Sequence, residues 1–312
     1  MPSEQIYALV LIDLSASLRA AVLNVVDARF EAGGQTLISS PENAAVRVLL
    51  TNGARGLAAV DIDALPSLEL ICSIGVGHEN IDVAYARSKG IAVTNGAGVN
   101  ADIVADHAMA LLLAVIRSVP AMDRAARAET RLAQLRIDPG LHGKRLGLVG
   151  GGHISRAIAR RVSGFDMQVG YHARSDRGQL AHRYFDSLHD LAQWCEVLVI
   201  AVPGGPETLH LIDHGVLCAL GPAGYLVNVG RGSVVNTAAL AAAMESRTIA
   251  GAALDVYESE PRAPQALLQF DNVVLSPHIG GRSEEAVAAQ ISMFLNNVER
   301  LSSQQPFINA LQ

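Results

Sequence analysis

The sequence is poor in cysteine, aromatic residues and charge, and each shortage excludes a class of protein. Its three cysteines, Cys72, Cys195 and Cys218, share no CxxC spacing, so we expect neither a disulfide framework nor a cysteine zinc site. Charged residues make up 17% of the chain, the net charge is −6 and no basic run occurs, which argues against nucleic acid or an anionic membrane as a partner. The first residues lack a basic region and carry Asp13 at the end of their apolar run, so they predict a strand and not a signal peptide. We therefore expect a cytoplasmic protein.

A long uninterrupted apolar run is also missing. The longest candidate, residues 103–119, is interrupted by Asp106, His107 and Arg117, so it predicts a buried helix and not a membrane span, with Asp106 and His107 as interior polar groups. What the chain has in quantity is apolar residues, 50% of 312, together with 28 glycines. This composition and length predict a close-packed enzyme of two domains.

Short apolar runs alternate with helical patterns from end to end, which predicts βαβ units and parallel sheets. The fold class we expect is α/β, with two doubly wound parallel-sheet domains. Expected strands are 7–12, 46–50, 70–74 and 91–94 in the first series, and 146–149, 168–171, 197–202, 225–229, 252–256 and 273–275 in the second. Expected helices include 18–30, 81–88, 100–119, 153–163, 187–194, 236–245 and 283–301, with Asn236 and Ser283 as N-caps.

The stretch LGLVGGGHISRAIARR (146–161) is a predicted strand, a glycine turn and a predicted helix. Gly150 and Gly152 match the first two glycines of GxGxxG, which allow a tight turn and a close approach of a pyrophosphate to the helix start. The third position is Ser155, where glycine would only ease helix packing. The pattern favours a dinucleotide-binding turn over a glycine-rich turn without a ligand, because it lies inside a βαβ unit.

Three further segments place chemistry at the ends of predicted strands. VNVGRGSVVNTAALAAAM (227–244), GAALDVYESEP (251–261) and NVVLSPHIGG (272–281) carry Arg231, Glu260 and His278 respectively. The carboxyl ends of parallel strands form the edge of an open sheet where ligands bind. Taken singly, each residue is as readily a surface ion pair, a solvated acid or a capping histidine. As an ordered set they predict one site.

Together these segments resemble the D-isomer-specific 2-hydroxyacid dehydrogenases, and within them the glyoxylate/hydroxypyruvate reductase branch. The likeness extends over nearly the whole chain, since SIGVGHENIDV (73–83) and GIAVTNGAGVNADIVADHAMALLLA (90–114) resemble that family's substrate loop and interdomain helix, and IAVPGGPETLHLI (200–212) its nicotinamide-side loop. Two departures are Ser155 and RAETRLAQL (127–135), where many relatives carry a tryptophan-containing segment.

The resemblance implies hydride transfer between a nicotinamide cofactor and a small 2-oxo acid. In this reading His278 donates the proton, Glu260 fixes its tautomer, and Arg231 holds the substrate carboxylate and carbonyl. It further implies a Rossmann NAD(P)-binding domain at 99–284, a substrate-binding domain at 1–98 plus 285–312, an active site in the cleft between them, and a homodimer built around the helix 102–119. Expected substrate contacts are Val76, Gly77, His78 and Asn100.

The stretch YHARSDR (171–177) decides which dinucleotide we expect. The family's ribose-binding acid falls at position 173, where this chain has Ala173, and Arg174, Ser175 and Arg177 follow. A 2′-phosphate would meet no acid there and would gain cationic partners, so the sequence predicts NADP, with NADPH preferred over NADH. Asp176 alone restores a negative charge. The full set of expected cofactor contacts is Gly150, Gly152, His153, Ile154, Ala173, Arg174, Ser175, Val202, Pro203, Thr208, Val229, Gly230, Asp255 and Gly280.

Other functions remain as alternatives. A non-catalytic, cofactor-sensing regulator of the same fold would keep the dinucleotide turn, but the intact trio of Arg231, Glu260 and His278 argues against it. Oxidation of formate or phosphonate would require insertions that the first hundred residues do not contain. A metal pair of His210 and His214 lacks a third ligand, so we expect no metal, and Ser233 lacks the nucleophile elbow of a serine hydrolase.

Overall fold

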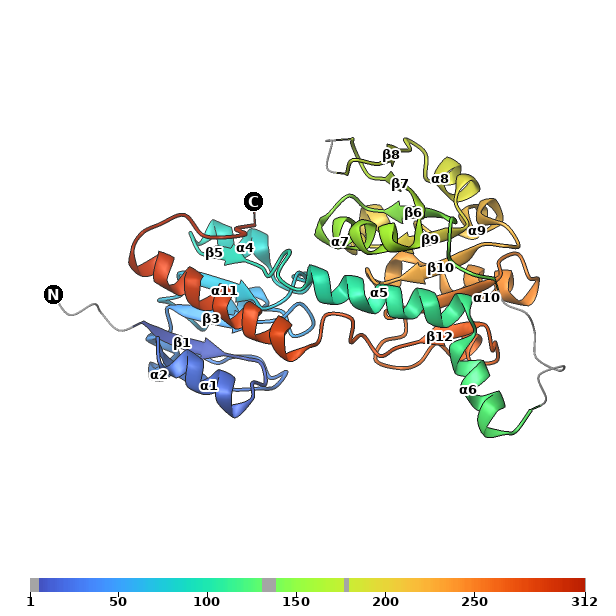
Figure 1. Cartoon of the computed structure of the whole chain (residues 1–312). Helices are drawn as coiled ribbons and strands as arrows, with labels where there is room; N and C mark the ends of the chain where they lie inside the picture. Colours follow the sequence, from blue (N-terminus) through green and yellow to red (C-terminus); the bar gives the residue numbers. More distant parts are fainter. Residues whose placement is uncertain (1–5, 131–138, 177–179, 312) are drawn as a thin grey trace. The chain divides into compact units, whose positions relative to one another are not determined.

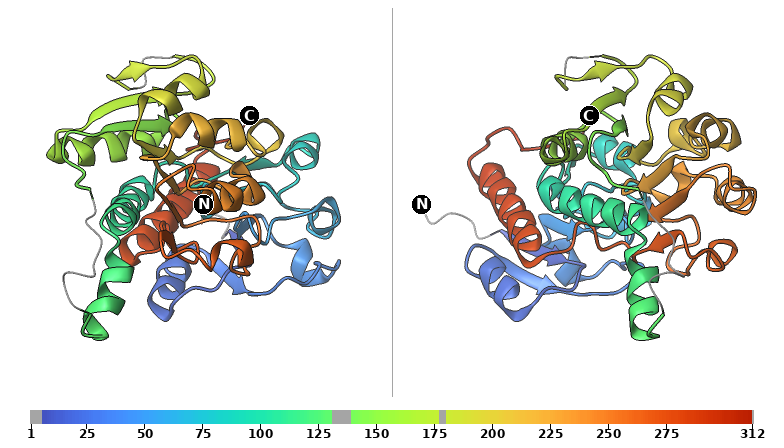
Figure 2. Two further views of the ribbon diagram at one scale, coloured as in Figure 1. Left: turned by 90° about the vertical axis from the view of Figure 1, so that its right-hand side faces the viewer. Right: turned by 45° about the vertical axis from the view of Figure 1, so that its right-hand side comes forward.

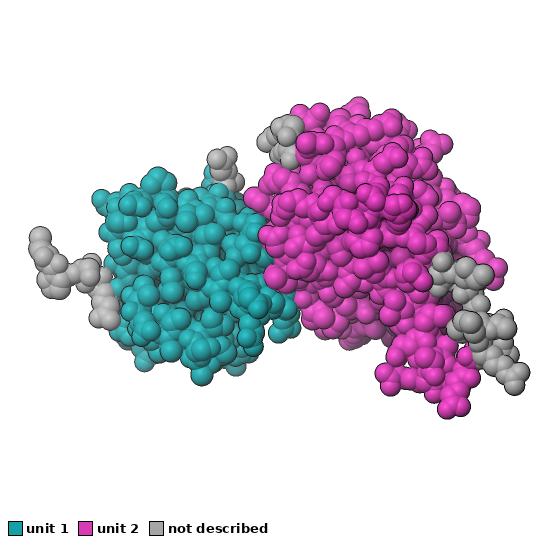
Figure 3. Space-filling model, in the orientation of Figure 1, with its two compact units in different colours: residues 1–100, 282–312 teal, residues 101–281 magenta. Residues whose placement is uncertain are grey.

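The computed structural model describes residues 6–130, 139–176 and 180–311, and it divides the chain into two compact units. Unit 1 contains residues 1–100 and 282–312, and unit 2 contains residues 101–281 (Figure 3). Unit 1 is therefore discontinuous in sequence. Of the residues singled out in the sequence, Arg177 and residues 131–135 of the segment 127–135 lie outside the described residues.

Unit 1 is built on a five-stranded parallel sheet in the order β2-β1-β3-β4-β5 (Figure 1). β2 lies on one side of β1, and β3, β4 and β5 follow on the other side, so the strand order reverses at β1, as in a doubly wound fold. The strands are β1 (Tyr7–Val10), β2 (Asp27–Phe30), β3 (Val48–Thr51), β4 (Leu70–Ser73) and β5 (Ala92–Thr94). The helices are α1 (Ala16–Leu23), α2 (Pro41–Ala44), α3 (Ala59–Asp63), α4 (Val83–Ser88) and α11 (Glu284–Ser302).

Both faces of this sheet are covered, because successive strand residues enter different hydrophobic clusters. Leu9, Leu49, Ile71 and Val93 pack with residues of α3 and α4 on one face. The alternate residues, among them Val10, Leu50 and Leu70, pack on the other face with Val22 of α1 and with Ile291, Phe294 and Val298 of α11. The last helix of the chain thus completes a core that the first hundred residues begin.

One sequence prediction in this unit is wrong. Residues 18–30 do not form one helix, because α1 ends at Leu23 and residues Asp27–Phe30 form β2, which pairs in parallel with β1. The helix ends where the N–H of Asn24 bonds back to the carbonyl of Ala20. β2 is an edge strand that is only half buried, so it lacks the continuous apolar run that marks the central strands.

Unit 2 is built on a seven-stranded parallel sheet in the order β12-β11-β10-β9-β6-β7-β8. Its switch point lies between β6 and β9, beside the glycine turn that follows β6. The strands are β6 (Arg145–Val149), β7 (Gln168–His172), β8 (Arg183–Tyr184), β9 (Val197–Ile200), β10 (Tyr225–Asn228), β11 (Gly251–Leu254) and β12 (Val273–Leu275). The α-helices are α5 (Ala101–Ile116), α6 (Val119–Arg127), α7 (His153–Val162), α8 (Leu188–Trp194), α9 (His214–Leu220) and α10 (Thr237–Glu245). Two parallel sheets flanked by helices confirm the predicted α/β class.

Two helical layers sandwich this sheet (Figure 2). Val197, Val199 and Val227 face α5 and α7, whereas Leu198 and Leu226 face α8, α9 and α10. The alternation again explains why the central strands are continuous apolar runs in the sequence. The predicted N-caps are confirmed, since Asn236 accepts from the N–H of Ala239 and Ser283 from the N–H of Ala286.

The helix α5 is shorter and more deeply buried than the sequence suggests. It ends at Ile116, and after Ser118, which has a positive φ of 49°, the chain continues as α6. Nine of the 16 residues of α5 are buried within unit 2, but no residue of α6 is. Among the described residues no single helix is long and apolar enough to cross a membrane; α5 and α6, bent by 58°, reach that length and composition only as a pair.

Candidate active site

The glycine turn after β6 has the geometry that a dinucleotide phosphate requires. Gly150 has a φ of +112°, and a Cβ there would lie 2.8 Å from the carbonyl oxygen of Ala201, so this position needs glycine. Gly152 is different, because a Cβ added to it would meet no atom within 4 Å. It precedes α7 without a side-chain cap. An uncapped helix start beside open space that no side chain fills fits a pyrophosphate, with His153 and Ile154 at the first helical positions.

Ser155, at the third fingerprint position, is fully buried in α7. Its hydroxyl oxygen has no hydrogen-bond partner within the part of the chain that the structure describes. The serine therefore fits as a small side chain and makes no hydrogen bond with the described residues. This agrees with the expectation that the third fingerprint position matters only for helix packing.

The segment after β7 carries the residues that we expect at the adenosine ribose. Arg174 extends to the carboxylate of Glu207, with 3.2 Å between Nη1 and Oε2, and both side chains are exposed. Asp176 is exposed, and its Oδ1 accepts a 2.6 Å hydrogen bond from the hydroxyl of Tyr171. That hydrogen bond, followed by burial, raises the pKa of Tyr171 to about 12, so the phenol remains a donor at neutral pH.

The loops after β9 and β10 pack tightly against each other. A Cβ on Gly230 would lie 2.6 Å from the carbonyl oxygen of Val202, and Thr208 Oγ1 donates to the carbonyl of Pro203 at 2.8 Å. Val229 and Gly230 are buried. The two loops therefore lie together at one edge of the sheet. They carry five of the expected cofactor contacts: Val202, Pro203, Thr208, Val229 and Gly230.

Glu260 and His278 form a direct pair. The distance between His278 Nδ1 and Glu260 Oε2 is 2.8 Å, and the other oxygen of Glu260 accepts from the N–H of Tyr257 at 2.9 Å. The carboxylate thus fixes the imidazole with its Nδ1 as donor and leaves Nε2 for a second proton. His278 is half exposed and adopts a φ of +55°, a backbone conformation that non-glycine residues rarely take.

Arg231 follows β10, the strand beside β11, so it lies at the same sheet edge as the loop of Glu260. Its Nη1 donates to the carbonyl of Gly230 at 2.8 Å, and its own carbonyl accepts from Asn228 Nδ2. The next residue, Gly232, lies directly on the 257–258 backbone, because a Cβ there would be 2.2 Å from the carbonyl carbon of Tyr257. The backbones that carry Arg231 and Glu260 are therefore in contact.

The expected substrate residues lie in unit 1. Ser73 Oγ donates to the carbonyl of Gly77 at 2.5 Å, and the carbonyl of Val76 accepts from Asn95 Nδ2 at 2.9 Å and contacts His78 Nδ1 at 3.1 Å. These bonds fix the carbonyl side of the turn. Asn100 has a buried Oδ1 without a partner among the described residues, which is the kind of atom that a ligand satisfies.

The two histidines considered for metal binding have separate partners. His210 Nε2 contacts Glu258 Oε1 at 2.6 Å, whereas His214 contacts the thiol of Cys218 at 3.3 Å. Burial raises the pKa of Glu258, but hydrogen bonds from Thr237 and His210 outweigh it and the net shift is downward. In the described ranges no three histidine, cysteine or acidic side chains gather as metal ligands would.

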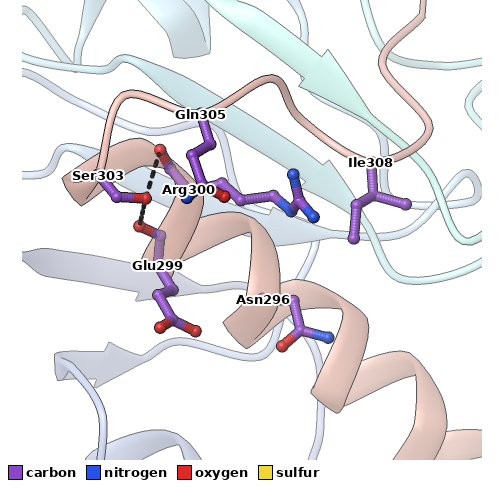
Figure 4. Close-up of a pocket in the computed structure, with 6 residues that line it drawn as sticks. All are labelled: Asn296, Glu299, Arg300, Ser303, Gln305 and Ile308. Carbon is purple, nitrogen blue, oxygen red and sulfur yellow. Dashed lines mark hydrogen bonds between the residues drawn. The ribbon is translucent and has the colours of Figure 1, made fainter.

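A separate pocket of about 320 Å³ lies in unit 1 between the end of α11 and the C-terminal segment (Figure 4). Two of its polar side chains bond to nearby carbonyls: Ser303 Oγ donates to that of Glu299, and Arg300 Nη1 to that of Pro306. None of the predicted site residues lines it; the lining residues are Asn296, Glu299, Arg300, Ser303, Gln305 and Ile308.

Comparison with known proteins identifies the class. The family model of the D-isomer specific 2-hydroxyacid dehydrogenases, NAD binding domain, matches residues 109–280. The chain is 37% identical to hydroxyphenylpyruvate reductase of Plectranthus scutellarioides, over 84% of both proteins, and 39% identical to 2-ketogluconate reductase of Gluconobacter oxydans, over 81% of the chain and 82% of that protein. A crystal structure of the NADPH-dependent glyoxylate/hydroxypyruvate reductase from Sinorhizobium meliloti, with NADP and malonate, superposes with a TM-score of 0.89 at 34% identity, covering 99% of the chain and 97% of that structure.

The chain therefore belongs to the D-isomer specific 2-hydroxyacid dehydrogenase family. It is an oxidoreductase with a nicotinamide dinucleotide as its cofactor, as the resemblance of the ordered motifs predicts. Among the relatives are several glyoxylate reductases, so the predicted branch is confirmed as well.

Proposed function

We propose that this protein reduces a small 2-oxo acid, such as glyoxylate or hydroxypyruvate, to the D-2-hydroxy acid with NADPH. The observation that carries the proposal is the Glu260–His278 pair, held at 2.8 Å at the sheet edge where Arg231 also lies. Relatives named for glyoxylate, hydroxypyruvate and hydroxyphenylpyruvate support a 2-oxo acid as the substrate class. NADP in a related structure supports the cofactor.

The chemistry adds a hydride to the carbonyl carbon and a proton to the carbonyl oxygen. The reduced nicotinamide, when bound, supplies the hydride. His278 donates the proton from Nε2, and Glu260 at Nδ1 stabilises the charged imidazole before transfer. Arg231 holds the substrate carboxylate and polarises the carbonyl through its planar set of donors. The backbone around Val76 and Gly77, with His78 and Asn100, provides the remaining contacts to the acid.

The direct test is consumption of NADPH with a panel of 2-oxo acids: glyoxylate, hydroxypyruvate, 2-ketogluconate and an aryl pyruvate. Turnover with at least one acid supports the proposal, and the ratio of kcat/KM values ranks the substrates. If NADPH binds, seen as a change in the fluorescence of the single tryptophan, Trp194, but no acid is reduced, a cofactor-sensing regulator is the better description.

The NADPH preference predicts a reversal by two substitutions. Ala173→Asp with Arg174→Ala should shift the kcat/KM ratio toward NADH by at least about tenfold, or about 1.4 kcal/mol, because the variant loses the phosphate partner and regains a ribose acceptor. In the parent, Oδ1 of Asp176 is already bonded to Tyr171, so this acid is a poorer ribose acceptor than an aspartate at position 173. Steady-state kinetics with both cofactors measure the shift.

A matched control is Arg160→Ala, which removes another exposed arginine with a carboxylate partner, Asp102, in the same unit. It should leave the ratio unchanged. A parent enzyme that already uses NADH as well as NADPH would rule out a phosphate clamp in residues 171–177.

We also propose a homodimer. The resemblance implies a dimer built around the helix 102–119, but the apolar residues of α5 face the core of unit 2 and are not free for such a contact. The exposed surface that a second chain could contact lies on α6, in which no residue is buried and Val119 is 52% exposed. We therefore expect light scattering to give the mass of two chains, and Val119→Asp to weaken the association. Val60→Asp, at an equally exposed position of α3, is the control that should remain dimeric. A single-chain mass for the parent at working concentration contradicts the proposal.

A further inference from the structure

The turn that carries His278 is organised by one buried carboxylate. Asp255 follows β11 and is 3% exposed. Its Oδ1 accepts from Ser276 Oγ at 2.6 Å and from the N–H of Ile279 at 3.0 Å, and its Oδ2 accepts from the N–H of Gly280 at 2.8 Å. The backbone carbonyl of Asp255 in addition accepts from the N–H of His278 at 2.8 Å. Residues on both sides of His278 are thus fixed to Asp255.

His107 reaches this carboxylate from α5. Its Nε2 lies 2.8 Å from Ser276 Oγ and 3.2 Å from Asp255 Oδ1. Because the Ser276 hydroxyl gives its hydrogen to Asp255, its oxygen acts as acceptor toward the imidazole, and Nε2 is the donor. The ring also packs on the turn, since a Cβ on Gly280 would lie 3.2 Å from His107 Cδ2 and 2.7 Å from Asp255 Oδ2.

Two features show why this turn needs support. His278 has a left-handed φ of +55°, which costs free energy unless neighbouring bonds hold it. The Asp255 carboxylate is out of water, so each lost donor leaves it less compensated and favours a rearrangement that exposes it. A shift of about 1 Å in a reacting group is enough to cost about a hundredfold in rate.

We propose that His107 is a positioning residue for the reaction. By donating to Ser276 and lying against the Asp255 carboxylate, it holds the turn of Ile279 and Gly280. Through that turn it sets the place of His278 opposite Glu260. The inference rests on the proposed role of His278 as proton donor. It assigns His107 no contact with substrate.

The test compares two substitutions of His107. His107→Leu removes the donor and should lower kcat by about ten- to a hundredfold, the range expected for a misplaced proton donor. KM for NADPH should rise by a smaller factor, because Gly280 of the same turn is an expected cofactor contact. His107→Gln places an amide N–H at the reach of Nε2 and should recover most of kcat. The control is Asp106→Asn on the same helix, which loses its ion pair with Arg161 and should alter thermal stability only.

Two further readouts separate positioning from folding. Ser276→Ala and the double variant His107→Leu/Ser276→Ala should show the same loss in kcat, because both residues act through Asp255 and their effects do not add. Amide hydrogen exchange should accelerate at residues 278–280 in His107→Leu and stay at parent level in His107→Gln.

The outcomes distinguish this inference from the proposed function. If the parent reduces no 2-oxo acid, the proposed function fails, and hydrogen exchange still decides whether His107 holds the turn. If the parent is active and His107→Leu keeps parent kcat, or if exchange at residues 278–280 does not change, the positioning role is wrong. An equal loss of kcat in the Leu and Gln variants also overturns it.

Discussion

Replacing His278 with alanine is expected to lower kcat by about two to four powers of ten with the best 2-oxo acid of the panel, the usual contribution of a general acid. The loss follows from the removal of the Nε2 donor that Glu260 orients at 2.8 Å. Because the glycine turn after β6 lies on a different loop, binding of NADPH should be largely kept. Single-turnover reduction and a fluorescence titration measure the two effects separately.

The chain contains a matched control for this variant. His210 and Glu258 form a second histidine–glutamate pair at 2.6 Å, and Glu258 lies on the same loop as Glu260. His210→Ala deletes an imidazole of similar exposure. It should lower the melting temperature but leave kcat nearly at the parent value. Near-parent turnover in His278→Ala, or an equal loss in both variants, would remove His278 from the mechanism.

Loss of Arg231 should have the second largest effect. Arg231→Ala is expected to lower kcat/KM by about a hundred- to a thousandfold, the range seen when a donor to a developing oxyanion is removed. The loss should appear in KM and in kcat together, since the guanidinium both binds the carboxylate and orients the carbonyl. Arg231→Lys should recover only part of it, because an ammonium lacks the planar pair of donors.

Arg262 provides the comparison for Arg231. It is exposed on the same segment as Glu260, and its N–H bonds to the carbonyl of Ser259. Arg262→Ala removes a positive charge without removing the proposed contact, so kcat/KM should change little. Complete recovery in Arg231→Lys, or equal losses at positions 231 and 262, would show that net charge and not geometry is what matters.

The positions of the central strands could be predicted from the sequence because each strand is buried on both faces. Val197–Ile200 and Tyr225–Asn228 are continuous apolar runs for this reason. The edge strand Asp27–Phe30 could not be predicted in the same way, because half burial leaves no such run and the segment continues a helical pattern. The end of α5 at Ile116 was likewise hidden, since Ser118 in the left-handed region has no distinctive sequence signal.

The candidate site divides in the same way. Arg231, Glu260 and His278 could be predicted as site residues because each follows a strand end and matches a residue with a chemical role in the family that the chain resembles. His107 did not, because a single histidine in an apolar helix has the same pattern whether its side chain is a passive interior group or, as here, a donor to residues 169 positions away. The other polar residues of this 16-residue helix are Asp102 and Asp106, and both are exposed, although Asp106 was expected to be an interior group. The available signal was a histidine followed at once by apolar residues.

The discontinuity of unit 1 has a consequence for how the protein is made. One face of its sheet is covered by Ile291, Phe294 and Val298 of α11, which the ribosome adds only after all of unit 2. Until then Val10, Leu50 and Leu70 have no cover from that helix, so the nascent chain exposes an apolar sheet face while residues 101–281 are added. Unit 2, whose residues are contiguous, is complete earlier. We therefore expect unit 2 to fold before unit 1, and the apolar sheet face of unit 1 to stay exposed until α11 has been synthesised.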